Sequence, residues 1–190
     1  MTTLHRYDVE VLHLLVSPQH AYFGRARDGA ADVPTTDADR VELVAGKGIV
    51  GDRFFGKAAH MDAAVTLLAV EGLEEMAAEL GTEPFDPLAT RRNVVLRGAQ
   101  LAPLLGEELV LESRGSSVRL RAGRPANPCV WMDRMLAPGA HAAMRGRGGV
   151  RCQVLTDGVL HRGPAVLVSP VPLDPARAGE AVVRRASRLP

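Results

Sequence analysis

The sequence predicts a mainly β fold, either a barrel or a sandwich, from three observations. Many short segments alternate apolar and polar residues or are rich in β-branched residues, as strands are. Polar turns containing glycine separate these segments. Only one segment has a convincing helical period, so the regular alternation of strand and helix that builds a doubly wound sheet is missing.

The strand pattern recurs along most of the chain. The expected strands, in order, cover residues 9–16, 40–45, 64–69, 93–96, 108–112, 118–121, 150–156 and 165–169. Segments 108–112 and 118–121 are expected to pair across the turn at 114–116. The dipeptide Asp157-Gly158 predicts a second hairpin directly after 150–156.

Helices are few. Leu73, Met76, Ala77 and Leu80 share one face at helical spacing, and Gly81 follows where a helix would stop. A second, shorter helix is expected within 130–144, broken at Pro138-Gly139. Residues 29–39 have the composition of a polar loop. We expect one domain over 1–170 and a C-terminal tail over 171–190, partly helical around 177–185.

Length and charge narrow the function classes. The chain has 190 residues, enough for one domain, and a formal net charge of +1, which excludes nucleic acid or an acidic membrane surface as a generic partner. No uncharged run approaches membrane-spanning length, and residues 1–16 carry charges instead of an apolar signal core. We therefore expect a cytoplasmic protein with reduced thiols.

Two glycine motifs resemble phosphate-binding loops. Residues 46–51 match G-x-G-x-x-G, but the sequence that follows has no helical period, so the helix N-terminus required for a dinucleotide is missing. Residues 51–57 match G-x-x-x-x-G-K, but Ala58 stands where a P-loop needs Ser or Thr. Both motifs are better explained as tight turns between strands.

The most unusual segment is 124–133, Arg-Pro-Ala-Asn-Pro-Cys-Val-Trp-Met-Asp. Two prolines stiffen the approach to Cys129. A thiol at a helix start lies near unpaired N–H groups and a positive dipole, which favour the thiolate, and Arg124 would add positive charge. A free cysteine is also often a small buried hydrophobe, so spacing alone leaves both roles open for Cys129.

The other cysteine has a simpler interpretation. Cys152 alternates with Val150 and Val154, so it belongs on the apolar face of a strand, in the core. Two cysteines cannot form a disulfide framework of the secreted type, and C-x-x-C metal spacing is missing.

Arginine-rich loops are the candidates for binding an anion beside the thiol. Residues 144–149 contain two arginines, whose side chains can hold an anion, and glycines, whose backbone N–H groups can approach it closely. Residues 91–93 and 52–53 form shorter arginine-containing loops. A single loop of this kind usually carries only exposed charges. The prediction of an anion site therefore depends on the combination of these loops with Cys129. His20 and His60, in loop-like stretches, are candidates for lining a pocket or for a zinc site with Cys129, although a solvated histidine is the commoner case.

The order of these motifs resembles the MOSC family, named after the C-terminal domain of molybdenum-cofactor sulfurases. The matching stretches are 17–24, 48–55, 91–98, the block from Pro128-Cys129 to Gly149, and 155–158. Each motif alone is weak, but five in the same order over about residues 9–168 are strong. A departure is Pro164, where relatives often carry an acidic residue; we expect it to affect only a turn.

The resemblance implies a MOSC-type β-barrel with a few short helices that binds a molybdopterin-type molybdenum cofactor. Cys129 lies at the position of the cysteine that ligates molybdenum or carries sulfur, and the arginine loops at positions that would hold the pterin phosphate. Pyridoxal phosphate belongs to a separate lyase domain of the larger sulfurases, which nothing here resembles, so it is not expected.

Two functions follow as hypotheses. The first is a molybdenum-cofactor-dependent oxidoreductase acting on N-hydroxylated substrates with electrons from a partner protein, or a sulfur carrier that uses Cys129. The second is a binding module for a phosphorylated pterin without chemistry. The predicted catalytic and metal-ligating residue is Cys129, and the predicted cofactor-binding residues are Arg53, Arg91, Arg92, Asn93, Arg124, Arg145, Arg147, Gly148 and Gly149.

Overall fold

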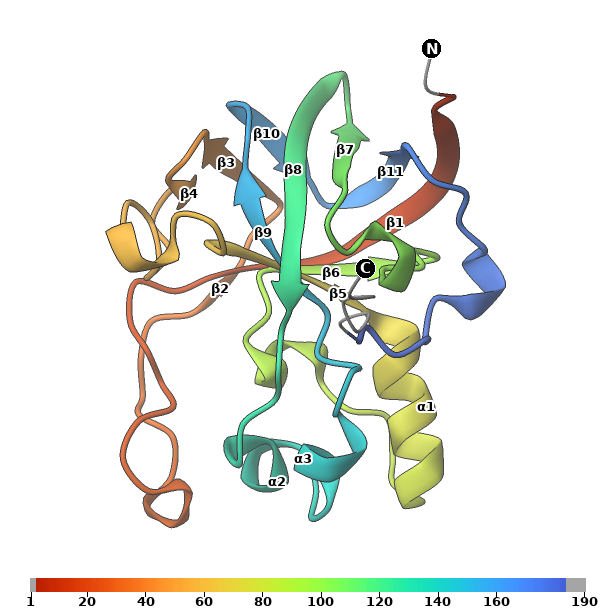
Figure 1. Ribbon diagram of the computed structural model, residues 1–190. Coiled ribbons are helices and arrows are strands. Elements are labelled where there is room, and N and C mark those ends of the chain that lie inside the picture. Colours follow the sequence, from red (N-terminus) through yellow and green to blue (C-terminus); the bar gives the residue numbers. More distant parts are fainter. Residues whose placement is uncertain (1–2, 184–190) are drawn as a thin grey trace, which may run out of the picture.

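The computed structural model describes residues 3–183 and confirms the mainly β fold (Figure 1). Seven strands form a closed barrel, in which β1 pairs with both β6 and β11 and only β5 and β6 run parallel. In their order around the barrel the strands are β1 (His5–Val16), β11 (Gly163–Ser169), β7 (Glu108–Ser113), β8 (Ser116–Pro125), β9 (Val150–Val154), β5 (Val65–Ala69) and β6 (Val94–Arg97).

The turn at 114–116 joins β7 and β8 as a hairpin, as predicted. Ser113 pairs with Ser116, and the two residues between them, Arg114 and Gly115, have φ of 46° and 80°. Positive φ at both central residues is the type I′ conformation that matches the twist of paired strands.

The hairpin predicted at Asp157-Gly158 is wrong. Strand β10 (Gly158–His161) follows directly, but it pairs with β3 (Arg40–Val44), which also pairs with β4 (Gly48–Ile49) in a separate small sheet. Both edges of β9 are already occupied by β5 and β8, so β9 has no free edge for β10. A short strand β2 (Thr36–Asp37) extends the barrel sheet beside β1.

The helix predicted over residues 73–80 and the shorter helix predicted within 130–144 are confirmed. Helix α1 (Val70–Leu80) ends at Gly81, whose φ of 64° is the left-handed conformation of a helix C-terminus. Helices α2 (Trp131–Met135) and α3 (Ala140–Ala143) are separated by the predicted break. Short 3₁₀ turns cover Ala26–Asp28, Ala58–His60, Pro87–Thr90, Ala102–Leu104 and Pro175–Arg177. Among residues 3–183 no helix has the length and apolar character needed to cross a membrane.

Two hydrophobic cores share strand β5. Its five residues are all buried, because alternate side chains face opposite cores. Val65, Leu67 and Ala69 belong to the barrel core, whereas Leu68 packs with the helices, which lie together below the barrel in Figure 1. Cys152 is fully buried in the barrel core, as predicted.

Both glycine motifs form turns. Gly46, Gly48 and Gly51 all have positive φ, and turns over 50–56 stand where a dinucleotide-binding loop would begin a helix. At Gly48, an added Cβ would lie 2.8 Å from the Ala64 Cβ, so close backbone approach also requires glycine. The chain after β11 packs back onto the barrel, with Val182 in its core. Of the tail expected to be partly helical around 177–185, residues 178–183 are not helical, and 184–185 lie outside the described residues.

Candidate functional site

Cys129 is exposed and lies between two anchored elements. Ala126, just after β8, donates its N–H to the carbonyl of Gly149 at 2.8 Å, and Met132, in α2, donates to the carbonyl of Cys129 at 3.0 Å. Trp131 and Met132 are buried against the helical core. The backbone on either side of the thiol is therefore held in place while the sulfur remains accessible.

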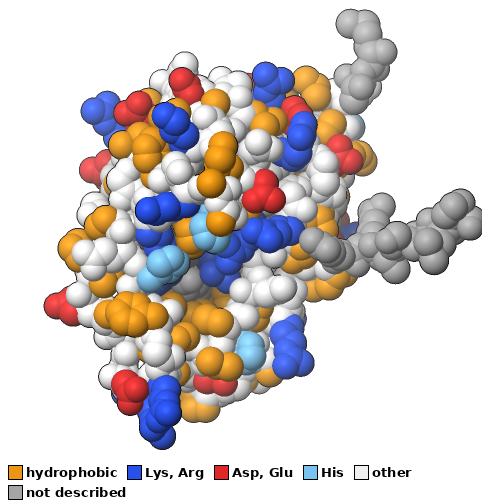
Figure 2. Space-filling model, turned by 60° about the vertical axis from the view of Figure 1, so that its left-hand side comes forward, with side chains coloured by type: hydrophobic (Ala, Val, Ile, Leu, Met, Phe, Trp, Pro, Cys, Tyr) orange, Lys and Arg blue, Asp and Glu red, His pale blue; other side chains and the backbone are white. Residues whose placement is uncertain are grey.

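The cysteine opens onto a cavity of about 160 Å³, which we call the thiol cavity. Lysine, arginine and histidine side chains gather around a hollow on the face drawn in Figure 2. The thiol cavity is lined by His20, Ala21, Tyr22, Arg53, Phe54, Thr66, Thr90, Arg91, Arg92, Cys129, Met132 and Arg151. Four of these residues are arginines, and within the described part of the chain no acidic residue lines it.

Arg92 holds the Cys129 loop against the rest of the site. Its Nε donates to the carbonyl of Gly148 at 3.0 Å, and its Nη2 donates to the carbonyls of Asn127 at 3.2 Å and Ala126 at 3.4 Å. These bonds use neutral carbonyls and leave the charge uncompensated. Burial lowers the pKa of Arg92 to about 10, with repulsion from Arg151 adding to the effect.

Arg53 and Arg91 also line the thiol cavity. Arg91 has φ of 56°, and its Nη2 donates to the carbonyl of Gln19 at 2.9 Å. Its guanidinium lies 5.7 Å from the centre of the Tyr22 ring, which stacks on Trp131. Arg53 donates to Asp52 at 3.2 Å, and its Nε is buried without a partner among the described residues. Burial lowers the pKa of both arginines.

Asn93 supports the thiol cavity without lining it. Its amide nitrogen donates to Asp52 at 3.2 Å and its amide oxygen accepts from the N–H of Thr66 at 3.1 Å. Asp52 in turn accepts from the N–H of Phe54 at 3.1 Å and from the Arg53 side chain. Asn93 is buried and does not line the thiol cavity, so its role in the site is to position Asp52 and, through it, Arg53.

The other predicted arginines do not line the thiol cavity. Arg147 pairs with Glu79 at 2.7 Å and lies over Gly72 of α1. Arg145 is exposed, and neither it nor Arg124 lines the cavity. Arg124, on β8, lies opposite Arg151 on β9, and its Nε is buried without a partner in the described chain.

Gly148 and Gly149 contribute close backbone contacts. A Cβ at Gly148 would lie 1.9 Å from the carbonyl oxygen of Ala126, and one at Gly149 would lie 1.9 Å from that of Leu67. Gly149 also has φ of 87°. Only glycine lets this loop pass so near the Cys129 segment and β5, and the Gly148 carbonyl then accepts from Arg92.

Arg151 is absent from the predicted site residues, yet it lines the thiol cavity. Strand alternation places Arg151 on the other face of β9 from Cys152, and the local pattern predicts that this face is exposed to solvent. The loops that cover this side come from distant parts of the chain, so the local pattern carries no signal of them. Burial lowers the pKa of Arg151, and the charge of Arg124 adds to that effect.

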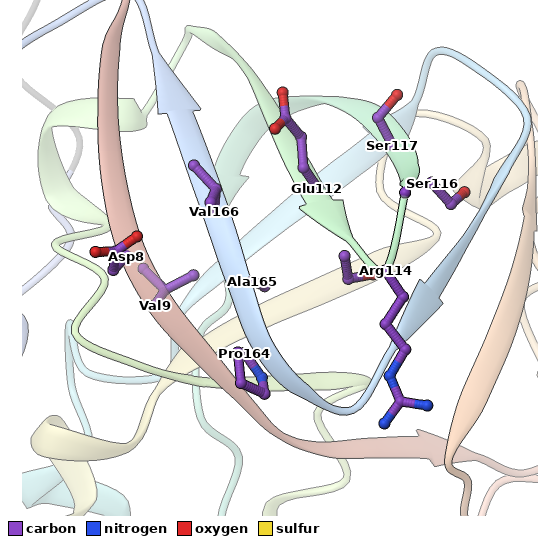
Figure 3. Close-up of a pocket in the computed structure, with 11 residues that line it drawn as sticks. Asp8, Val9, Glu112, Arg114, Ser116, Ser117, Pro164, Ala165 and Val166 are labelled. Atoms are coloured by element: carbon purple, nitrogen blue, oxygen red, sulfur yellow. The ribbon is translucent and has the colours of Figure 1, made fainter.

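A larger hollow of about 570 Å³ lies over β1, β7 and β11 (Figure 3). Its charged groups are of both signs, and Glu112 in its wall forms an ion pair with Arg6 at 2.6 Å. It contains no predicted site residue. Within residues 3–183, no group of three or more His, Cys, Asp or Glu side chains is placed to hold a metal ion.

Comparisons with known proteins agree with this architecture. Similar folds occur in the YuaD protein from Bacillus subtilis (TM-score 0.66, 17% identity, covering 87% of this chain and 98% of that one). The YiiM proteins from Geobacillus stearothermophilus and Escherichia coli are each 19% identical with a TM-score of 0.57. They cover 84% and 94% of this chain, and 74% and 76% of their own chains, respectively.

No curated protein matches the chain in sequence. The model of the MOSC domain matches residues 46–167, which include Cys129, Arg53, Arg91, Arg92 and Arg151. This span also takes in strands β4 to β10 and all three helices. The chain therefore belongs to the MOSC domain family, which is generally associated with the molybdenum cofactor.

Proposed function

We propose that this chain binds a molybdopterin-type molybdenum cofactor at the thiol cavity, where the sulfur of Cys129 either ligates the metal or carries a sulfur atom. The observation that carries the proposal is one exposed thiol in a cavity lined by four arginines. As an enzyme, the protein would reduce N-hydroxylated compounds, with electrons from a partner protein in the cytoplasm. As a sulfur carrier, it would hold a persulfide on Cys129.

The residues present fit such a group. Four guanidiniums whose pKa values are lowered by burial would be stabilised by an anion, and a phosphate matches their forked donors. A single thiol suits a metal whose other ligands come from an organic cofactor, since sulfur donors suit such metals.

The residues of this chain would have distinct roles. Arg53, Arg91, Arg92 and Arg151 would neutralise the phosphorylated ligand, and the Arg92 bonds to 126, 127 and 148 would keep the thiol loop closed over it. When bound, the cofactor would supply two-electron chemistry at a metal with an exchangeable position. Arg145 and Arg147 do not line the thiol cavity, so the proposal does not depend on them.

The test compares the two cysteines. Wild type, Cys129→Ala and Cys152→Ala are produced in a host that makes the cofactor, and molybdenum and pterin are measured per mole of folded protein. We expect Cys129→Ala to lose most of the metal or all sulfur-transfer and reductase activity, because it removes the only exposed sulfur of the two cysteines. Cys152→Ala should retain both, at some cost in thermal stability.

A Cys129→Ala protein with full metal content and full activity would contradict the proposal. If instead metal and pterin remain bound while every activity is missing from wild type and variant alike, the binding module without chemistry becomes the better explanation.

A further inference from the structure

A second cavity, which we call the outer chamber, adjoins the thiol cavity. It measures about 640 Å³, and His20, Arg53 and Phe54 line both cavities. The proposed function uses the thiol cavity and leaves the outer chamber without a role. Its volume lies within the range of about 300–1,000 Å³ typical of small-molecule sites, whereas the thiol cavity alone is smaller.

Flat rings form much of the wall of the outer chamber. The Phe54 ring meets the His20 ring edge-on, at 5.1 Å and 75°, and the His60 ring at 4.6 Å and 59°. Phe23, also in the lining, is 64% exposed. Ring faces and edges attract another aromatic ring in offset or edge-on contact, so this wall favours a flat aromatic ligand.

The polar groups of the chamber favour an anion. Arg53 has a side chain only 9% exposed, and both its Nε and the Nδ1 of His60 are buried without a hydrogen-bond partner in residues 3–183. Arg53 is paired with Asp52 at 3.2 Å, so the charge of the chamber that no described acidic residue offsets is that of Lys57, and no acidic side chain of the described residues lines the chamber. Burial, together with the charges of Arg53 and Arg91, lowers the pKa of His20, as expected where cations are crowded.

The chamber is also open to solvent. Residues 57–59 on its rim are exposed, as is Phe23. A ligand that must exchange in every turnover needs such access, whereas a resident cofactor gains from the closer enclosure and denser positive charge of the thiol cavity.

We propose that the outer chamber binds the substrate, and that this substrate is a flat aromatic compound carrying a negative charge such as a carboxylate. The inference rests on the proposed function, because the shared wall of His20, Arg53 and Phe54 would place the reacting end of the substrate at the thiol cavity. It adds a ligand class that the thiol and its arginines do not specify.

The test measures binding calorimetrically with three probes: naphthoate, its neutral analogue naphthamide, and the non-aromatic anion cyclohexanecarboxylate. Naphthoate should bind at least about tenfold more tightly than either of the others, since only it satisfies both the rings and the charge. The preference should persist in cofactor-loaded protein. Equal affinity for naphthoate and naphthamide would overturn the proposal, and so would loss of naphthoate binding on loading, because the cofactor would then occupy the chamber.

Variants of the two lysines in the chain sharpen the test. Lys57→Gln should weaken naphthoate binding by about threefold and leave naphthamide unchanged, the size expected for an exposed ion pair. Lys47→Gln makes the same change in net charge outside the chamber and should leave both affinities unchanged. An equal loss in both variants would overturn the assignment of the charge to this chamber.

The proposed function fails by a different measurement. If the protein retains no molybdenum or pterin in a cofactor-producing host, that function is wrong, while the naphthoate and naphthamide comparison on the same chain still decides the ligand class of the outer chamber.

Discussion

The thiol cavity concentrates positive charge that the described residues do not neutralise. Asp52 pairs with Arg53, but Arg92 donates only to carbonyls, and Arg151 faces Arg124 across the strand pair. Directly opposed like charges destabilise a sheet. The free protein therefore loses some stability at this site, and an anionic ligand would restore it.

Arg151→Gln should separate these two effects. Removing one crowded cation should raise the free energy of unfolding by about 1 kcal/mol, a modest gain because the side chain is only partly buried. It should also weaken binding of inorganic pyrophosphate by about tenfold, since a forked donor is lost. Thermal unfolding and calorimetry measure the two changes.

Arg145→Gln is the matched control for Arg151→Gln, because Arg145 is exposed and lies outside the thiol cavity. It makes the same change in net charge and should leave pyrophosphate affinity nearly unchanged. If both variants weaken pyrophosphate equally, the effect belongs to the overall charge of the protein and not to the cavity.

At the scale of elements, Asp37 links strand β2 to β1 and to Arg162, the residue just before β11. It accepts from the N–H of Leu14 at 3.0 Å, from His13 Nδ1 at 2.9 Å and from Arg162 at 2.9 Å. Burial alone would raise the pKa of Asp37, but these hydrogen bonds and the charges of His13 and Arg162 outweigh it and lower the pKa below 3.8. The carboxylate is thus stabilised in the folded state.

Asp37→Asn should lower the free energy of unfolding by about 2 kcal/mol at neutral pH. Because the folded pKa lies below the unfolded one, the carboxylate's contribution is fully present above pH 3.8 and is lost as pH falls through the folded pKa. The difference between wild type and variant should therefore shrink below that pH, as measured by urea unfolding.

Asp39 provides the control for Asp37, since it pairs with the same arginine but has a side chain that is 88% exposed. Asp39→Asn should change stability by less than about 0.5 kcal/mol at any pH. A loss as large as that of Asp37→Asn would show that Arg162, and not the half-buried Asp37 carboxylate, dominates the contact.

For the whole molecule, β5 is the wall common to the barrel core and the helical core. Gly149 lies against this wall, where its backbone passes the carbonyl of Leu67, and Gly149 also accepts the N–H of Ala126 beside the Cys129 loop. The thiol cavity is therefore built on the junction of the two cores. Disturbing that junction should affect both of them together.

Gly149→Ala should lower the free energy of unfolding by at least about 3 kcal/mol, since it adds both a backbone clash and strain at positive φ. Unfolding is followed by the fluorescence of Trp131, the single tryptophan, in the helical core and by circular dichroism of the whole chain. Both signals should shift together.

Gly163→Ala is the matched control, with φ of 104° but no atom within 4 Å of an added Cβ. It should cost about 1 kcal/mol from strain alone. Equal losses of unfolding free energy in the two variants would mean that the clash with Leu67 adds nothing to the strain at positive φ.

The sequence alone determined the seven barrel strands and β3, the main helix, the turn at 114–116 and the core position of Cys152, but not the short strands β2, β4 and β10. These are local properties: alternation at period two, spacing on one helical face, and residues that tolerate positive φ. Cys152 is predicted to be a core residue because apolar and polar residues alternate along its own strand. The motif order was sufficient for the family, which residues 46–167 confirm.

Only the tertiary structure decided which neighbours meet. Strand β10 pairs with β3 because β9 has no free edge, and Arg151 faces the thiol cavity because loops from distant segments cover its side of the sheet. Arg147, in the loop that looked most suited to an anion, instead pairs with Glu79 of α1. Edge occupancy and pairing of charges depend on groups far apart in the chain, and no local pattern encodes them.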